Sequence, residues 1–177
     1  MQPSISAYYH TMMGDVFVGF LCAYAMFLFA YAGYDKWWDS HPANLAGFLA
    51  VGIALFPTGL DTLVTGCNMK AWYTNETIHH ICAASFFLVL TYFSLFQFTK
   101  THPGQVPQGQ KIKRNRVYKI CGYLMLACLV LIALYWLWLD DVFPQLSRIK
   151  PVFILESVAL WAFGVSWLTK GDTIWAD

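Results

Sequence analysis

The sequence has few charged residues, and long stretches of it have none. Charged side chains make up 12% of the 177 residues, whereas hydrophobic side chains make up 58%. A soluble domain usually carries about 25% charged residues. The formal net charge of +1 gives no reason to expect binding to nucleic acid. We therefore predict a protein whose apolar surface faces lipid rather than water.

Motifs of the common catalytic and metal-binding classes are absent as well. The five cysteines form no CxxC pair, and neither GxSxG nor a Walker sequence occurs. Internal repeats are not apparent. No cofactor is expected from these observations, and whether the chain is an enzyme stays open.

What the sequence does contain is five apolar stretches, four of them without a charge. Each has close to the roughly 20 residues that a helix needs to cross about 30 Å of hydrocarbon. Backbone groups in lipid must bond to one another, so these stretches are predicted to be helices. We expect an all-α, polytopic transmembrane helix bundle in a single domain over residues 1–177. The five predicted spans are residues 16–34, 43–60, 77–99, 120–139 and 151–169.

Basic residues are concentrated between the third and fourth predicted spans. Residues 100–119 hold six of the eleven Lys and Arg residues. Basic loops stay on the cytoplasmic side, which predicts this loop inside and the N-terminus outside. Arg148 and Lys150 would then lie outside, but two residues do not outweigh six. The simplest interpretation is that the loop sets the topology, although its charges can also attract anionic lipid headgroups.

The remaining ionisable residues gather near the predicted outer ends of the spans. Glu156 is the only acidic side chain clearly inside a span. A carboxylate in lipid costs several kcal/mol, so Glu156 should face the bundle interior and have a partner. His79 or His80 is the nearest candidate in depth. The candidate ligand-binding residues are His10, Asp15, Asp61, Glu76, His79, His80 and Glu156.

The two adjacent histidines cannot both face the interior, because neighbouring residues on a helix point about 100° apart. We favour His80 as the interior one. Ala84, Ser85 and Leu88 continue a face of smaller residues from it, and small residues let helices approach closely. The same divergence makes it hard for His79 and His80 to bind one ion, so no metal is expected.

Two interpretations of these polar residues remain open. In the functional one they form a pocket, open to the outer side, that binds a lipid or a small ligand. In the structural one a Glu–His hydrogen bond fixes the helix register. We expect an integral membrane protein with membrane lipid as its partner. The alternatives are an intramembrane lipid-modifying enzyme, with or without a metal, and an oligomeric interaction or pore-forming subunit. A homo-oligomer or a larger membrane complex is left open.

Three short segments resemble a known group of membrane proteins. They are Pro3-Ser4-Ile5-Ser6, the histidine-led stretch from Ile78 to Phe87, and the segment from Leu155 to Leu160 that contains Glu156. They are similar to segments of the DRAM-type and FGF-receptor-activating-protein-type group. The resemblance implies a polytopic helical membrane protein with roles tied to lipids or membrane organisation. Two features differ from the group, which typically has six spans and often a Trp where this chain has Ser157.

Overall fold

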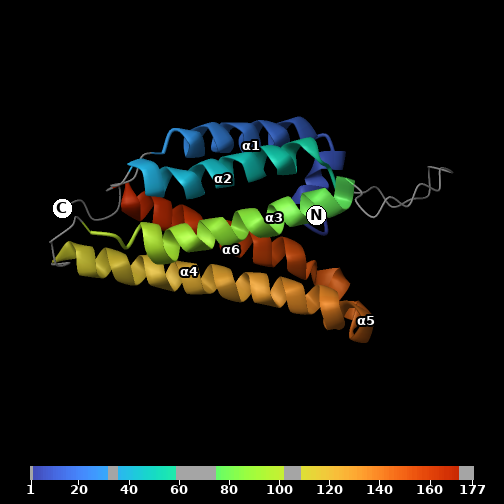
Figure 1. Ribbon diagram of the computed structural model, residues 1–177. Coiled ribbons are helices and arrows are strands. Elements are labelled where there is room, and N and C mark those ends of the chain that lie inside the picture. The colour runs from blue at the N-terminus through green and yellow to red at the C-terminus, as the bar shows by residue number, and fades with distance from the viewer. Residues whose placement is uncertain (1, 32–35, 59–74, 102–108, 172–177) are drawn as a thin grey trace. The chain divides into compact units, whose positions relative to one another are not determined.

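The computed structural model describes residues 2–31, 36–58, 75–101 and 109–171, which are helical over most of their length (Figure 1). No strand occurs in this described part of the chain. Five of the helices coincide with the five apolar stretches of the sequence. The all-α fold predicted from those stretches is therefore confirmed.

Contacts divide the chain into an N-terminal unit, residues 4–86, and a C-terminal unit, residues 87–177. The boundary falls inside helix α3 (Asn75–Tyr92), so this helix gives its first turns to one unit and its last turns to the other. That the chain forms a single transmembrane domain stays a prediction.

The N-terminal unit is built on the helix pair α1 (Gly14–Phe29) and α2 (Lys36–Leu55), which run side by side in Figure 1. The 3-10 turn η1 (Ser6–His10) precedes them. Small side chains let two helices approach closely, and they dominate the buried face of α2. The small buried residues of α2 are Ala43, Ala46, Gly47, Ala50 and Ala54.

The C-terminal unit is built on α4 (Gln110–Leu134) and α6 (Pro151–Lys170), which pack along one another. Two π-helical turns extend the helices that precede them: η2 (Phe93–Gln97) follows α3, and η3 (Tyr135–Leu139) follows α4. The short segments α5 (Asp140–Val142) and η4 (Pro144–Ile149) connect to α6.

Two kinds of contact fix η2 against α4 and α6. The hydroxyl of Ser94 donates to Oγ of Ser166 at 3.0 Å, and both side chains are fully buried. A short distance along the chain, Phe98 forms the centre of an aromatic cluster. Its ring lies 5.5–6.1 Å, centroid to centroid, from those of Phe93, Tyr118, Phe163 and Trp167.

Within the described ranges, three helices are long and apolar enough to cross a membrane: Glu76–Gln97, Gln110–Leu139 and Pro151–Lys170. These segments contain or nearly match the third, fourth and fifth predicted spans, and they fit a membrane protein. The helices at the first two predicted spans are shorter as apolar segments, Gly14–Phe29 and Ser40–Leu55. That these two also cross a membrane stays a prediction.

Helix α2 begins at Lys36, seven residues before the start of the second predicted span, and contains Pro42. A proline lacks the N–H that bonds to the carbonyl four residues earlier. Pro42 lies in the second turn of the helix, so few backbone bonds precede it. The polar residues that precede the second predicted span therefore form the first turns of α2.

Candidate functional site

The most buried ionisable side chain of the predicted site is His79, which is only 1% exposed. Its Nδ1 lies 2.7 Å from the carbonyl oxygen of Phe56. A carbonyl oxygen can only accept, so Nδ1 carries the proton and donates. In the neutral ring, Nε2 is then an acceptor. Nε2 is buried and has no hydrogen-bond partner in the part of the chain that the structure describes.

The position of His79 follows from the way α2 ends. The last carbonyl groups of a helix lack backbone partners, and Pro57 offers no N–H to continue the ladder. His79 supplies a donor to Phe56 at this point. His10 supplies another, since its Nε2 lies 2.6 Å from the carbonyl oxygen of Thr58. The two histidines, from η1 and α3, thus lie within hydrogen-bond distance of the backbone carbonyl groups on either side of Pro57.

The expectation that His80 faces the interior was wrong. His80 is half-buried, whereas His79 is fully buried. The face that continues from His80 is also the exposed one, since Ala84 and Leu88 are exposed. The buried side of α3 instead carries the bulky Phe86. Packing around an aromatic ring, rather than close approach of small residues, sets the orientation of this helix.

The acidic candidates of the N-terminal unit are less enclosed. Asp15 and Glu76 are exposed and lie in the first turns of α1 and α3. An acidic side chain at a helix N-terminus is stabilised by the helix dipole, which accounts for both positions without a ligand. Asp61 lies outside the described residues.

Glu156 is half-buried in the second turn of α6 and belongs to the C-terminal unit. The histidines that were expected to pair with it belong to the N-terminal unit. Its predicted hydrogen bond to one of them therefore stays a prediction. Of the seven candidate residues, the structure brings together the histidines at the end of α2, with Glu76 one turn before His79.

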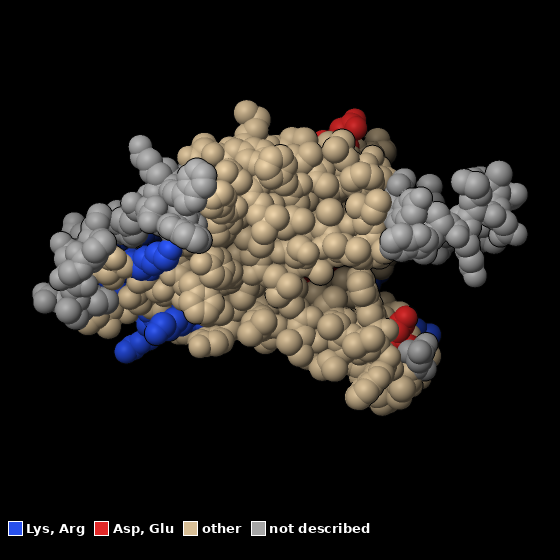
Figure 2. All heavy atoms as spheres, in the orientation of Figure 1, with Lys and Arg blue, Asp and Glu red and all other residues tan. Residues whose placement is uncertain are grey.

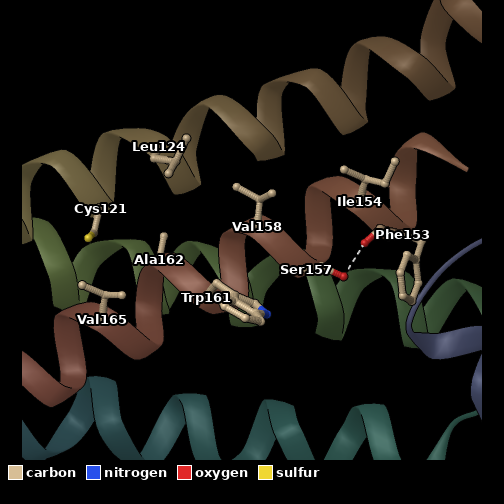
Figure 3. A pocket seen from close by; sticks show the side chains of 9 residues that line it. All are labelled: Cys121, Leu124, Phe153, Ile154, Ser157, Val158, Trp161, Ala162 and Val165. Atoms are coloured by element: carbon tan, nitrogen blue, oxygen red, sulfur yellow. Dashed lines mark hydrogen bonds between the residues drawn. The ribbon is translucent and has the colours of Figure 1, made fainter. Parts of the chain in front are cut away.

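A second feature lies in the C-terminal unit, where α4 and α6 enclose an apolar groove of about 560 Å³ (Figure 3). Val158 points from α6 toward α4, and Leu124 comes from α4. The hydroxyl of Ser157 is already used, because it donates to the carbonyl oxygen of Phe153 at 2.7 Å. The lining residues are Cys121, Leu124, Phe153, Ile154, Ser157, Val158, Trp161, Ala162 and Val165.

The groove offers apolar contact and almost no hydrogen bonding. Its most exposed side chain is Trp161, at 80%, and Ile154 and Val165 are also exposed. Such a lining suits a flexible hydrocarbon chain, which needs contact area rather than directed bonds. These residues cannot be distinguished in the sequence, because an apolar residue that lines a groove looks the same there as one that faces lipid.

Gln97 is a buried polar residue outside the predicted site. It lies in η2, is 2% exposed, and neither its side-chain nitrogen nor its oxygen has a hydrogen-bond partner among the described residues. A signal was present, because Gln97 is the only carboxamide inside the third predicted span. Unpaired polar groups in such a position are costly.

Across the described ranges, no group of three or more His, Cys, Asp or Glu side chains lies close enough to hold a metal ion. The cysteines in these ranges form no disulfide, and Cys121 and Cys128 are buried as small apolar side chains. The comparisons with known proteins add no further constraint: no protein family, no curated protein and no solved structure matches the chain.

Proposed function

We propose that this chain is an integral membrane protein that binds membrane lipid, with an acyl chain lying in the groove between α4 and α6. The observation that carries the proposal is the lining of that groove, which is mostly apolar. Its polar groups are the hydroxyl of Ser157, which is already bonded, the thiol of Cys121 and the indole N–H of Trp161. Both helices are long and apolar enough to cross a membrane. The groove would then open toward the acyl chains of the bilayer.

The size of the groove agrees with this occupant. Its volume of about 560 Å³ falls within the range of roughly 300–1,000 Å³ that is common for ligand sites. Each buried CH₂ group contributes about 0.8 kcal/mol when it leaves water, but the gain is smaller for a chain that leaves lipid. The groove therefore favours a resident lipid that exchanges with the bilayer over a tightly held soluble ligand.

A groove-filling variant tests the proposal. Val158→Trp places a large ring in the middle of the groove from an exposed position, while Val130→Trp makes the same change on an exposed part of α4 that does not line it. Native mass spectrometry of the purified protein counts retained lipids. We expect Val158→Trp to lose one retained lipid relative to the wild type and to Val130→Trp. Equal lipid counts in all three proteins would contradict the proposal.

A second candidate function is the binding of a polar ligand at His79. The observation in its favour is the buried Nε2 acceptor, whose unpaired state costs about 1–3 kcal/mol. A ligand that brings an O–H or N–H group to this atom would recover that cost. The ligand can be a lipid headgroup or a small molecule, which leaves the alternatives of a binding protein and a lipid-modifying enzyme in place.

Nitrogen NMR on protein with ¹⁵N-labelled histidine tests this second function. A donor on Nε2 of His79 shifts its resonance, so the spectrum in lipid nanodiscs should differ from that in lipid-free detergent. The resonance is assigned by its loss in His79→Gln. An Nε2 resonance that is identical with and without lipid would argue that no lipid binds there.

A further inference from the structure

The exposed face of α4 carries a shallow hollow whose lining changes from basic to apolar along the helix. Arg116 and Lys119 lie toward the start of α4, and Ile120 and Tyr123 lie one turn further on. Ile120 and Tyr123 are 60% and 63% exposed. The residues that line the hollow are Ile112, Asn115, Arg116, Lys119, Ile120 and Tyr123.

The hollow lies on the side of α4 that is turned away from its packing partners. Its residues follow the spacing 112, 116, 119 and 123, which places them along one side of a helix. The buried face carries Tyr118, Cys121 and Met125, about half a turn away around the helix axis. Since the buried face packs in the C-terminal unit, the hollow is left open to whatever surrounds this helix.

The length of α4 places the hollow at a membrane boundary. The segment Gln110–Leu139 has 30 residues, or about 45 Å, whereas hydrocarbon is about 30 Å thick. No charge occurs from Ile120 to Leu139, and this part alone spans about 30 Å. Lys119 and Arg116 therefore fall at the level of lipid headgroups, while Ile120 and Tyr123 fall at the level of the first acyl carbons.

All charged residues in this region are basic. The whole segment from Gln110 to Leu139 contains no Asp or Glu. Neither Arg116 nor Lys119 forms a salt bridge or a side-chain hydrogen bond within the described part of the chain. Figure 2 shows basic side chains gathered at the end of α4 that contains Gln110. Two basic side chains next to two exposed apolar ones are complementary to a phospholipid, in which an anionic phosphate is next to an acyl chain.

From this arrangement we propose that α4 binds an anionic phospholipid, with its phosphate on Arg116 and Lys119 and its acyl chain along Ile120 and Tyr123. The planar guanidinium of Arg116 suits bidentate contact with phosphate oxygens, and Lys119 adds a second charge. The inference goes beyond the groove between α4 and α6. It concerns another face of α4 and assigns selectivity for headgroup charge, which the apolar groove cannot provide.

The test compares phosphatidylglycerol with phosphatidylcholine on the full-length protein. Detergent-purified protein is incubated with an equimolar mixture of the two lipids, and native mass spectrometry measures the ratio in which they bind. Each basic residue near a membrane surface contributes enough for about a fivefold preference. We expect the wild type, with two such residues, to favour phosphatidylglycerol by about 25-fold and Arg116→Gln/Lys119→Gln to show a ratio near one.

The matched control is Lys113→Gln/Arg148→Gln, which removes the same charge from exposed positions that do not line the hollow. It should keep the wild-type preference. Equal losses in the two double variants would overturn the site in favour of general surface charge, and a wild type without any preference would overturn it outright. Thermal unfolding confirms that both variants are folded. The two proposals can fail separately. If Val158→Trp loses one retained lipid but the wild type shows no headgroup preference, the lipid site in the groove is supported and the site on Arg116 and Lys119 is excluded.

Discussion

At the end of α2, the side chain of His79 donates a hydrogen bond to a backbone carbonyl. Pro57 has no N–H to bond to the carbonyl of Ile53, four residues earlier, so the helical pattern of bonds stops there. The carbonyl of Phe56, next to this end, receives a hydrogen bond from Nδ1 of His79 at 2.7 Å. Because that imidazole is 1% exposed, water cannot replace it. The residue therefore has a structural role at the end of the helix, whatever binds to its other nitrogen.

Alanine substitution separates the two histidines. His79→Ala leaves the carbonyl of Phe56 without its donor in a buried place and opens a cavity, so we expect the free energy of unfolding to fall by about 2–4 kcal/mol. His80→Ala, at a half-buried position, should lower it by less than about 1 kcal/mol. Urea or thermal unfolding in detergent measures both values. A larger loss for His80→Ala would show that His80 has the structural role.

The sequence predicted that the histidines and Glu76 form a polar site near the end of a span, but not which histidine is buried. The prediction of His80 rested on small residues that continue its face. What decides the orientation is the carbonyl of Phe56, about twenty residues away in sequence, together with the ring of Phe86. A contact between distant segments leaves no periodic trace in either one.

At the scale of the elements, η2 and α4 approach closely at Gly122 in α4. A Cβ atom built at this position would lie 3.3 Å from the Cβ of Ser94 and 2.5 Å from side-chain atoms of Leu95. Ser94 is itself held by its bond to Ser166. The absence of a side chain at Gly122 thus allows η2 and α4 to pack at their present distance.

Gly122→Ala should therefore destabilise the protein, by about 1–3 kcal/mol, because overpacking displaces Leu95 and strains the Ser94 contact. Gly164→Ala is the matched control, since no atom lies within 4 Å of a Cβ built at Gly164 in α6. That change should be neutral or slightly stabilising, because alanine is the better helix former. Melting temperatures in the same detergent compare the two. Equal melting temperatures would contradict the close approach at Gly122.

The apolar stretches predicted the existence of the helices well and the ends of α6 to within one residue, but they did not predict where α2 and α4 begin. An uncharged run marks what lipid can cover, so the fourth span was predicted to start at Ile120. Hydrogen bonding within the helix does not depend on charge, and α4 continues back through the basic residues to Gln110. The same reasoning explains why α2 includes polar residues from Lys36 onward.

For the molecule as a whole, the remaining question is its orientation in the membrane. The concentration of basic residues before Ile120 predicts that the start of α4 is cytoplasmic. If Gln110–Leu139 crosses the bilayer, the segment η4 lies on the opposite side. The basic residues Arg148 and Lys150 near the end of η4 make this a prediction worth direct measurement.

Single cysteines at Gln110 and Gln145 measure the orientation, since both side chains are exposed. In a background without the native cysteines, an impermeant thiol reagent added to intact cells should label Gln145→Cys and leave Gln110→Cys unlabelled. Permeabilised cells provide the control, because both positions should then react. Labelling of position 110 alone would invert the topology, and labelling of both would mean that α4 does not cross.

The π-helical turns carry a consequence for how the sequence compares with others. In η2 the N–H of Phe98 bonds to the carbonyl of Phe93, five residues earlier, at 2.9 Å, so the turn holds one residue more than an α-helical turn. A homologue that lost a residue between Phe93 and Gln97 could still form a continuous helix. Its alignment with this chain would show a one-residue gap there, and every later side chain of that helix would be rotated by about 100°. An evolutionary deletion at η2 would thus turn the ring of Phe98 away from the aromatic cluster. We therefore expect homologues that lack a residue here to differ also at the aromatic residues that contact Phe98.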